Sequence, residues 1–266
     1  MPTRLRPLRT LILCAALATP AAAPAQSPTS ADARLRALYD GEWRWRGQEL
    51  NPDGGTRFPR VDPASQQARL AYWTRALATL DSIPFAELSP EEQVNAQVFR
   101  AMVEGLASDV RWRTYEAPFN SDTFFWTEGA PRGGLRTAAD YRRWFARLRD
   151  LPRYFDEQIA NMRAGLARGY SVPRVAVQGR DATIVPYTRA DTTNPLRAPL
   201  LQIPATIPAD ERAALRQEGE TVVRDVAVPA YAKLLTMMRA EYLPRARTTL
   251  AARALPDGET FYKAQI

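Results

Sequence analysis

The stretch SPEEQVNAQVFRAMVEGLASDV, residues 89–110, decides the fold class of this chain. Ser89 can cap a helix, Pro90 suits the first helical position, and Glu92 stands where it would complete a capping box. Apolar residues then recur at nearly every fourth position, which is typical of an amphipathic helix with one core-facing side. The stretch therefore predicts a long helix. Its predicted core face consists of Val94, Val98, Met102, Leu106 and Val110.

Helical patterns continue on both sides of this stretch. Asp62 followed by Pro63 predicts the start of an earlier helix, and Ile83-Pro84 predicts its end. Residues 137–140 form a second capping box, which opens a helix that stops near Leu151-Pro152. A further helix closes at Gly169, as at a left-handed C-cap. The last two helices predict a helical hairpin.

The second half of the chain predicts more helix around an irregular segment. Residues 172–207 contain many prolines and β-branched residues, which favours an extended crossing of the surface with at most one or two short strands. A last long helix is expected from Ala209 to Tyr242, with a kink or break at Pro229. The predicted fold class is all-α, a multi-helix assembly.

A long aromatic loop interrupts the helices at residues 113–136. Loops of this length in compact domains often carry function, because a binding surface varies most easily there. The alternative is that its aromatic side chains pack as a satellite core. The candidate substrate-binding residues, from this loop and from the turn after Gly169, are Phe124, Trp126 and Tyr170.

The N-terminus has the pattern of a secretory signal peptide over residues 1–25. Arginines come first, an apolar run from Leu11 to Leu17 follows, and Ala23-Pro24-Ala25 is an A-x-A cleavage site. The run is shorter than the roughly 20 residues of a spanning helix. We therefore predict an exported protein, periplasmic or secreted, with a polar linker at 26–32, a helical part at 33–266, and no membrane span after signal removal.

The composition excludes several classes of function. The chain contains no histidine, so histidine-dependent catalysis and H-E-x-x-H zinc binding are excluded for these residues. The formal net charge is +7, but arginines alternate with acidic residues along the expected helices, which indicates a solvated surface and no nucleic-acid partner. Residues 169–173, GYSVP, lack the last glycine of a nucleophile elbow. No spacing singles out a pair of carboxylates, so the residues alone indicate no catalytic and no metal site.

Several short motifs, in order and spacing, point further. They are TAADY at 137–141, RLRDLP at 147–152, MRAGLARG at 162–169, VPRV at 172–175, YLPRAR at 242–247, and LPDG at 255–258 followed by Tyr262. Together they resemble the bacterial family called domain of unknown function 885, over roughly residues 33–266.

The resemblance implies a fold and an activity. Members of this family look like exported or lipid-anchored zinc metallopeptidases of the gluzincin type, mostly helical, with the zinc-binding helix late in the chain. Their N-terminal helices resemble one wall of a substrate channel, and a peptide is the substrate of full-length relatives. This chain stops at Ile266, before that catalytic half. The resemblance therefore implies an N-terminal half that is inactive alone, with no cofactor of its own, zinc in full-length relatives, and a missing C-terminal half as partner.

Two alternatives stay open. The chain could be a free-standing helical peptide-binding module, with its binding surface on the aromatic loop and the turn at Gly169. It could also be an enzyme that works with carboxylates alone, which requires two acids converging in a cleft with raised pKa values.

Overall fold

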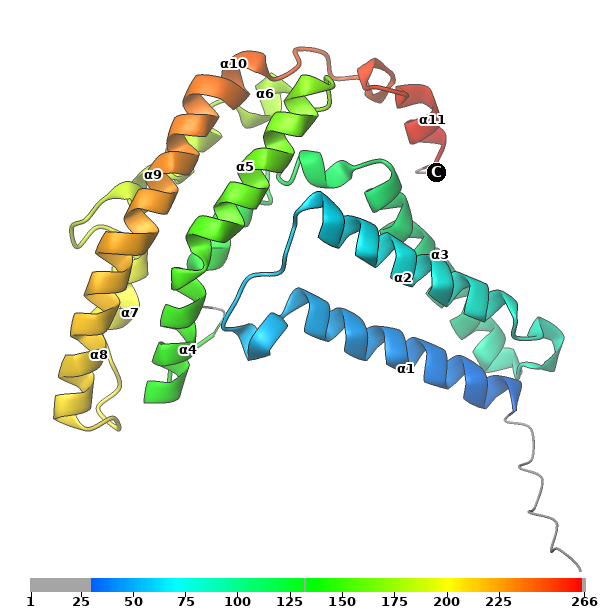
Figure 1. Ribbon diagram of the computed structural model, residues 1–266, viewed down its shortest axis with the longest axis horizontal. Helices are drawn as coiled ribbons and strands as arrows, with labels where there is room; N and C mark the ends of the chain where they lie inside the picture. Colours follow the sequence, from blue (N-terminus) through cyan, green and yellow to red (C-terminus); the bar gives the residue numbers. More distant parts are fainter. Residues whose placement is uncertain (1–29, 132, 265–266) are drawn as a thin grey trace, which may run out of the picture.

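The structure is a computed structural model that describes residues 30–131 and 133–264. Every regular element within these residues is a helix or a helical turn, so the predicted all-α fold is confirmed (Figure 1). The predicted signal peptide and residues 26–29 of the predicted linker lie outside the described residues. None of the described helices combines the length and the apolar character needed to cross a bilayer.

Three helices form an N-terminal region: α1 (Ala31–Leu50), α2 (Pro63–Asp81) and α3 (Pro90–Arg111). Each begins where a side chain caps it, since the side chains of Ser30, Asp62 and Ser89 accept a backbone N–H from the first turn. The cap at Ser30 starts α1 at Ala31, two residues before the predicted helical start at 33. The predicted helix starts at Pro63 and Pro90 are confirmed.

The predicted core face of α3 is wrong for Val94, Val98 and Met102, but Val110 is buried as predicted and Leu106 packs against the core. Val94 and Val98 are 59% and 64% exposed, and the buried face is the next one around the helix. Both faces repeat with helical spacing, but small alanines on the buried face allow α1 and α2 to approach closely. The capping box is also incomplete, because Asp32 Oδ1 and not Glu92 accepts the Ser89 backbone N–H, at 2.9 Å. The buried face of α3 consists of Glu92, Ala96, Phe99, Val103, Ala107 and Val110.

The C-terminal region contains two long helical rods that run side by side in the same direction (Figure 1). One rod joins α4 (Ala138–Arg149) to α5 (Leu151–Ala167) through Asp150, whose backbone is itself helical. The predicted hairpin is therefore wrong, because only Asp150 separates the two helices and its helical backbone does not reverse the chain. The predicted capping box at Thr137 and Asp140 is present, and Gly169 has the left-handed φ of +80° expected after the end of α5.

The second rod runs without a break through α8 (Ala209–Val222), α9 (Val228–Met237) and α10 (Leu243–Arg245). Two π-helical turns, Val223–Ala227 and Met238–Tyr242, join these three helices. Each π turn ends two residues before a proline, Pro229 or Pro244. A wider turn accommodates the proline's missing N–H and its ring within a continuous helix, so the predicted kink or break at Pro229 is a π bulge.

The segment 172–207 returns the chain from the end of the first rod to the start of the second. It contains no strand and is built from short helical pieces, including α6 (Arg174–Val177) and α7 (Ala198–Leu201). The expected extended surface crossing is wrong, because apolar side chains spaced along the segment enter the core between its turns. These side chains are Val177, Ile184, Leu196, Leu200, Ile203 and Ile207.

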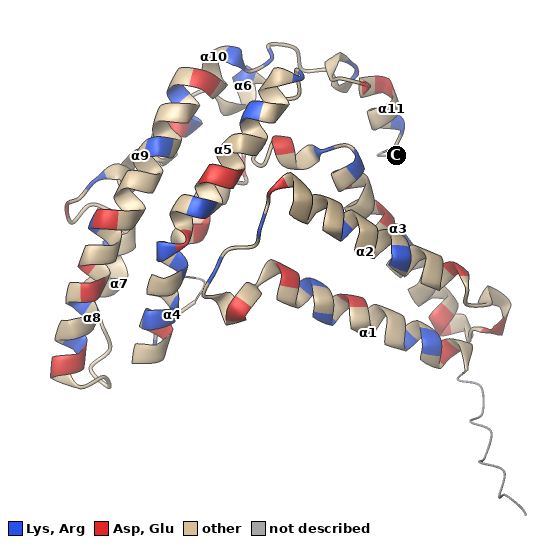
Figure 2. Cartoon of the chain, viewed as in Figure 1, with Lys and Arg blue, Asp and Glu red and all other residues tan. Residues whose placement is uncertain are grey.

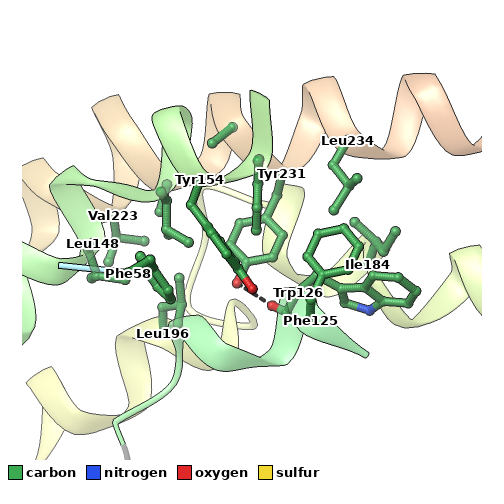
Figure 3. Packing of buried hydrophobic residues seen from close by; sticks show 14 of the residues in the cluster. Phe58, Phe125, Trp126, Leu148, Tyr154, Ile184, Leu196, Val223, Tyr231 and Leu234 are labelled. Atoms are coloured by element: carbon green, nitrogen blue, oxygen red, sulfur yellow. Dashed lines mark hydrogen bonds between the residues drawn. The ribbon is translucent and has the colours of Figure 1, made fainter. Parts of the chain in front are cut away.

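Most of the core lies between the two rods and the return segment (Figure 3). Tyr231 on α9 is fully buried there and donates a hydrogen bond from its hydroxyl to the Trp126 carbonyl, at 2.6 Å. Phe155 meets the Tyr231 ring edge to face at 4.9 Å. A separate, smaller cluster fills the N-terminal region. The aromatic loop thus contributes to the core of the C-terminal region.

A partly buried set of charges, the arginine clip, fastens the connector 56–62 to the first rod. It consists of Asp150, Arg153 and Glu157. Arg153 binds both carboxylates and donates to the Phe58 carbonyl at 2.8 Å, while Asp150 accepts the Phe58 N–H at 2.9 Å. The clip therefore holds the N-terminal region against the C-terminal region.

Candidate functional site

A hollow of about 270 Å³ lies where the connector between α1 and α2 meets α4 and the loop residues 130–131 and 133–135. We call it the Arg147 cleft. It brings together segments that lie far apart in the sequence. Its wall includes Asn51, Gly54, Gly55, Ala130, Pro131, Gly133, Gly134, Leu135, Asp140, Arg143, Trp144 and Arg147.

Glycines form one side of this cleft. Gly54 and Gly55 follow Asp53, and all three have left-handed φ values of 52° to 89°. Gly133 also has a positive φ, of 128°. Such backbone favours glycine, which also leaves peptide groups uncovered by side chains. A ligand in the cleft could therefore approach backbone groups directly.

Two arginines one helical turn apart on α4 form the opposite side. Arg147 is buried, with its guanidinium 3.8 Å from the centre of the Phe58 ring. Its Nη1 donates to the Arg57 carbonyl at 2.9 Å, and its Nη2 lies 3.6 Å from a Glu128 carboxylate oxygen. Arg143 is half exposed. These contacts hold Arg147 in place, and Arg143 is the more exposed of the two guanidinium groups.

Asp140 is the acid in the cleft wall, and groups at the start of α4 donate hydrogen bonds to its carboxylate. Hydrogen bonds from the Thr137 hydroxyl and from the backbone N–H groups of Thr137 and Arg136 lower its pKa. Its other oxygen lies 3.5 Å from Arg143. The exposed Arg143 guanidinium beside uncovered backbone suits a small anionic group with two oxygens, and a carboxylate is the simplest such group.

The sequence-predicted residues lie outside this cleft. Trp126 is fully buried and donates from Nε1 to the Thr183 hydroxyl at 3.0 Å, and the Phe124 ring stacks on it at 4.8 Å. Tyr170 is buried under Arg168, whose guanidinium lies 4.3 Å from its ring centre. The structure thus brings Phe124 and Trp126 together in the core, while Tyr170 packs against Arg168 instead. The substrate-binding role of the three residues stays a prediction.

Sequence reasoning missed the Arg147 cleft. Its signal was the glycine pairs 54–55 and 133–134 in two loops, together with Arg143 and Arg147 four residues apart. Neither pattern predicts that the two loops meet, because about 80 residues separate them along the chain. Only the arginine clip and the docking of the connector bring them together.

Other chemistry finds little support among the described residues. No group of three or more acidic, cysteine or histidine side chains is placed to hold a metal ion in residues 30–131 and 133–264. Ser171 is buried, and its hydroxyl accepts the Arg247 N–H at 3.0 Å, which is a structural contact. Burial raises the pKa of Asp109, but its hydrogen-bond partner is Thr114 and not a second acid. Asp109 is therefore not one of two acids that converge in a cleft.

Comparison with known proteins gives the family. The profile of a family described as bacterial protein of unknown function (DUF885) matches residues 46–266. The chain belongs to this family. No curated protein matches it.

A solved structure shares the fold. It is the crystal structure of a candidate lipoprotein from Colwellia psychrerythraea, which matches with a TM-score of 0.70 at 15% sequence identity. The match covers 88% of this chain and 45% of the other. The chain therefore spans less than half of the structure that it resembles.

Proposed function

We propose that this chain is a helical, non-catalytic part of a DUF885 protein related to gluzincin-type zinc metallopeptidases, and that it binds peptides by their terminal carboxylate. The Arg147 cleft supports the proposal, because it places the exposed Arg143 guanidinium opposite loop backbone that glycines leave uncovered. Backbone groups suit a peptide main chain, and a guanidinium suits its terminal carboxylate.

The non-catalytic assignment follows from composition. A zinc peptidase of this type binds its metal with two histidines of an H-E-x-x-H helix, and this chain contains no histidine. Zinc and the peptide-cleaving site would then belong to the rest of a full-length relative. The match covers only 45% of the solved structure, so a full-length relative has room for a separate catalytic part.

Calorimetric titration with a short peptide tests the binding. We expect binding by a peptide with a free C-terminal carboxylate, and at least about tenfold weaker binding by the same peptide with an amidated C-terminus. Arg143→Ala should weaken binding of the peptide with the free carboxylate to a similar degree, because Arg143 is the more exposed guanidinium in the cleft.

Arg142→Ala is the matched control. Arg142 neighbours Arg143 on α4, but it binds Glu211 on α8, at 2.6 Å, and is not part of the cleft wall. Equal affinity for the free and the amidated peptide would refute carboxylate recognition. Cleavage of either peptide by the purified chain, with or without added zinc, would refute the non-catalytic assignment.

Export is the second part of the proposal. It rests on the signal-peptide pattern at residues 1–25 and on the description of the matched structure as a lipoprotein candidate. Expression of the full chain in a Gram-negative host should yield periplasmic protein whose first residue is Gln26. Protein that stays in the cytoplasm with residues 1–25 uncleaved would contradict the proposed export.

A further inference from the structure

The end of the molecule where both rods stop is rich in arginine, and we call it the arginine end. Residues 158–180 and 242–256 come together there and contain seven arginines, no lysine and no acidic residue. Figure 2 shows basic residues on α6, on α10 and along the chain that follows α10. Two of the seven arginines bind a carboxylate. The other five form no ion pair within residues 30–131 and 133–264: Arg174, Arg180, Arg245, Arg247 and Arg253.

Backbone carbonyls hold two of these unpaired arginines in place. The Arg174 backbone N–H donates to the Arg247 carbonyl at 2.7 Å, and its guanidinium donates to the Pro244 carbonyl at 2.6 Å. The Arg247 guanidinium donates to the carbonyls of Ser171 and Thr249, at 2.8 and 2.6 Å. A carbonyl satisfies an N–H group but does not neutralise the charge of a guanidinium, which stays protonated in proteins. The positive charge at this end is therefore uncompensated.

Two acids beside the arginine end are already engaged. Both carboxylate oxygens of Glu241 accept from Arg163, at 2.8 and 2.6 Å. These bonds, with the nearby charge of Arg245, lower the pKa of Glu241. Glu116 is buried and binds Arg168. Each carboxylate is thus balanced by a partner outside the five unpaired arginines.

The remaining nearby acids lie at the border of this surface. Asp181 binds an arginine of the second rod at 2.7 Å. The exposed Asp109 on α3 and Asp257 before α11 (Gly258–Lys263) lie on the side where Phe261 packs on the end of α3. The one acid within α11 pairs with a lysine of the same helix, at 2.7 Å. The ends of the two rods are therefore basic, and the acids begin toward α11.

Two exposed apolar side chains lie within the same segments. Leu250 is 69% exposed in the loop that the Arg247 guanidinium holds, and Val175 in α6 is 68% exposed. Basic side chains with exposed apolar ones among them are typical of a surface that binds the interface of a lipid bilayer. Single-stranded nucleic acid would need exposed rings for stacking, but the aromatic residues of the two segments, Tyr170 and Tyr242, are buried. Lipid is therefore the favoured partner.

We propose that the arginine end docks on the surface of a membrane that contains anionic phospholipids. The exposed Arg245 and Arg253 contact lipid phosphate groups, while Leu250, between them in the sequence, enters the interface. The first rod separates the arginine end from the Arg147 cleft at α4 (Figure 1). Docking is therefore independent of the proposed peptide binding.

Flotation of the full chain with lipid vesicles tests the docking. We expect binding to vesicles of phosphatidylglycerol and phosphatidylcholine in equal parts, and weaker binding as the salt concentration rises. The double substitution Arg245→Glu with Arg253→Glu should weaken this binding at least about tenfold, because each arginine close to an anionic surface contributes about fivefold. Both side chains are exposed, so the substitutions should leave the fold intact.

Arg44→Glu with Arg75→Glu is the matched control. Arg44 on α1 and Arg75 on α2 are also exposed, and the pair changes the net charge by the same amount. This variant should bind the vesicles like the wild type. Residues 1–25 are the same in all three proteins, so their apolar run causes no difference between them. Equal loss of binding in both double variants would overturn the proposal, because net charge and not the arginine end would then cause binding. Wild type that does not bind the anionic vesicles, or that binds only a DNA fragment, would also overturn it.

A fluorescent label tests which surface faces the bilayer, in a chain whose single cysteine is replaced by Cys14→Ser. An environment-sensitive label on Leu250→Cys should shift its emission to the blue when anionic vesicles are added, because the label leaves water. The same label on Leu201→Cys is the control, since Leu201 is 57% exposed but lies on α7. A shift at residue 201, or none at residue 250, would refute docking through the arginine end.

Discussion

The two regions of this molecule solve the same packing problem with different side chains. The C-terminal cluster contains 31 buried apolar residues and draws on aromatics such as Trp126 and Tyr231. The N-terminal cluster contains 12, four of them alanines, and lies beside the buried charged side chains Glu42 and Glu92. Less apolar area is buried in the N-terminal region, so its helices depend more on contacts outside their own cluster. The arginine clip supplies one such contact.

Trp126→Ala should have the largest effect, because it opens the centre of the larger core. We expect a loss of about 3–5 kcal/mol in the free energy of unfolding, since the side chain is fully buried and also donates to Thr183. Chemical denaturation followed by circular dichroism measures it.

Phe99→Ala sharpens this result. Phe99 belongs to the smaller cluster and also lines two hollows at the surface between α1 and α3. Water in these hollows can replace part of the contact that the substitution removes. We expect a clearly smaller loss than for Trp126→Ala. Equal losses of unfolding free energy for the two variants would show that the two clusters contribute equally to stability.

Asp150→Asn should break the connection between the regions. Asp150 accepts the Phe58 N–H and binds Arg153, and its side chain is 9% exposed. Loss of the charge leaves Arg153 with one carboxylate fewer, and we expect a cost of about 2–3 kcal/mol at pH 7. Denaturation at pH 7 measures it. Asp156→Asn, at an exposed ion pair with Lys233, should cost less than about 0.5 kcal/mol.

The same substitution has a defined pH dependence. Burial acts to raise the pKa of Asp150, but the hydrogen bonds from Arg153 and the Phe58 N–H outweigh it, and the pKa lies below its usual range. The folded pKa is therefore lower than the unfolded value of about 3.9. The stabilisation is present above that value and is lost as pH falls through the folded pKa. The difference between wild type and Asp150→Asn should thus narrow below about pH 4, and a constant difference down to pH 2 would contradict this account.

Thr137→Ala should have the smallest effect of these four substitutions. It removes the cap of α4, whose hydroxyl also contacts Asp140, and we expect a loss of about 1 kcal/mol. Thr221→Ala within α8 is the control, because its hydroxyl only returns to the Gln217 carbonyl of its own helix. A thermal melt in which both variants lose the same stability would remove the capping argument.

Local chemistry explains which predictions succeeded. Helix starts depend on a few adjacent residues, so Pro63, Pro90 and Thr137 could be identified without the fold. The buried face of α3 could not, because two apolar stripes compete and only the approach of α1 and α2 selects one. The return segment 172–207 was misjudged for a related reason. Its prolines suggested an extended chain, but the helical pieces between them are stabilised by apolar side chains that reach a distant core.

By itself, the sequence determined the helical class, the caps and the absence of histidine-based chemistry, since these depend on composition and on neighbours within one turn. Tertiary structure alone decided the pairing of Gly54 with Arg147 in one cleft, the burial of Trp126 and the exposure of Val98. These features depend on which distant surfaces exclude water together, and the spacing of residues along one helix does not contain that information.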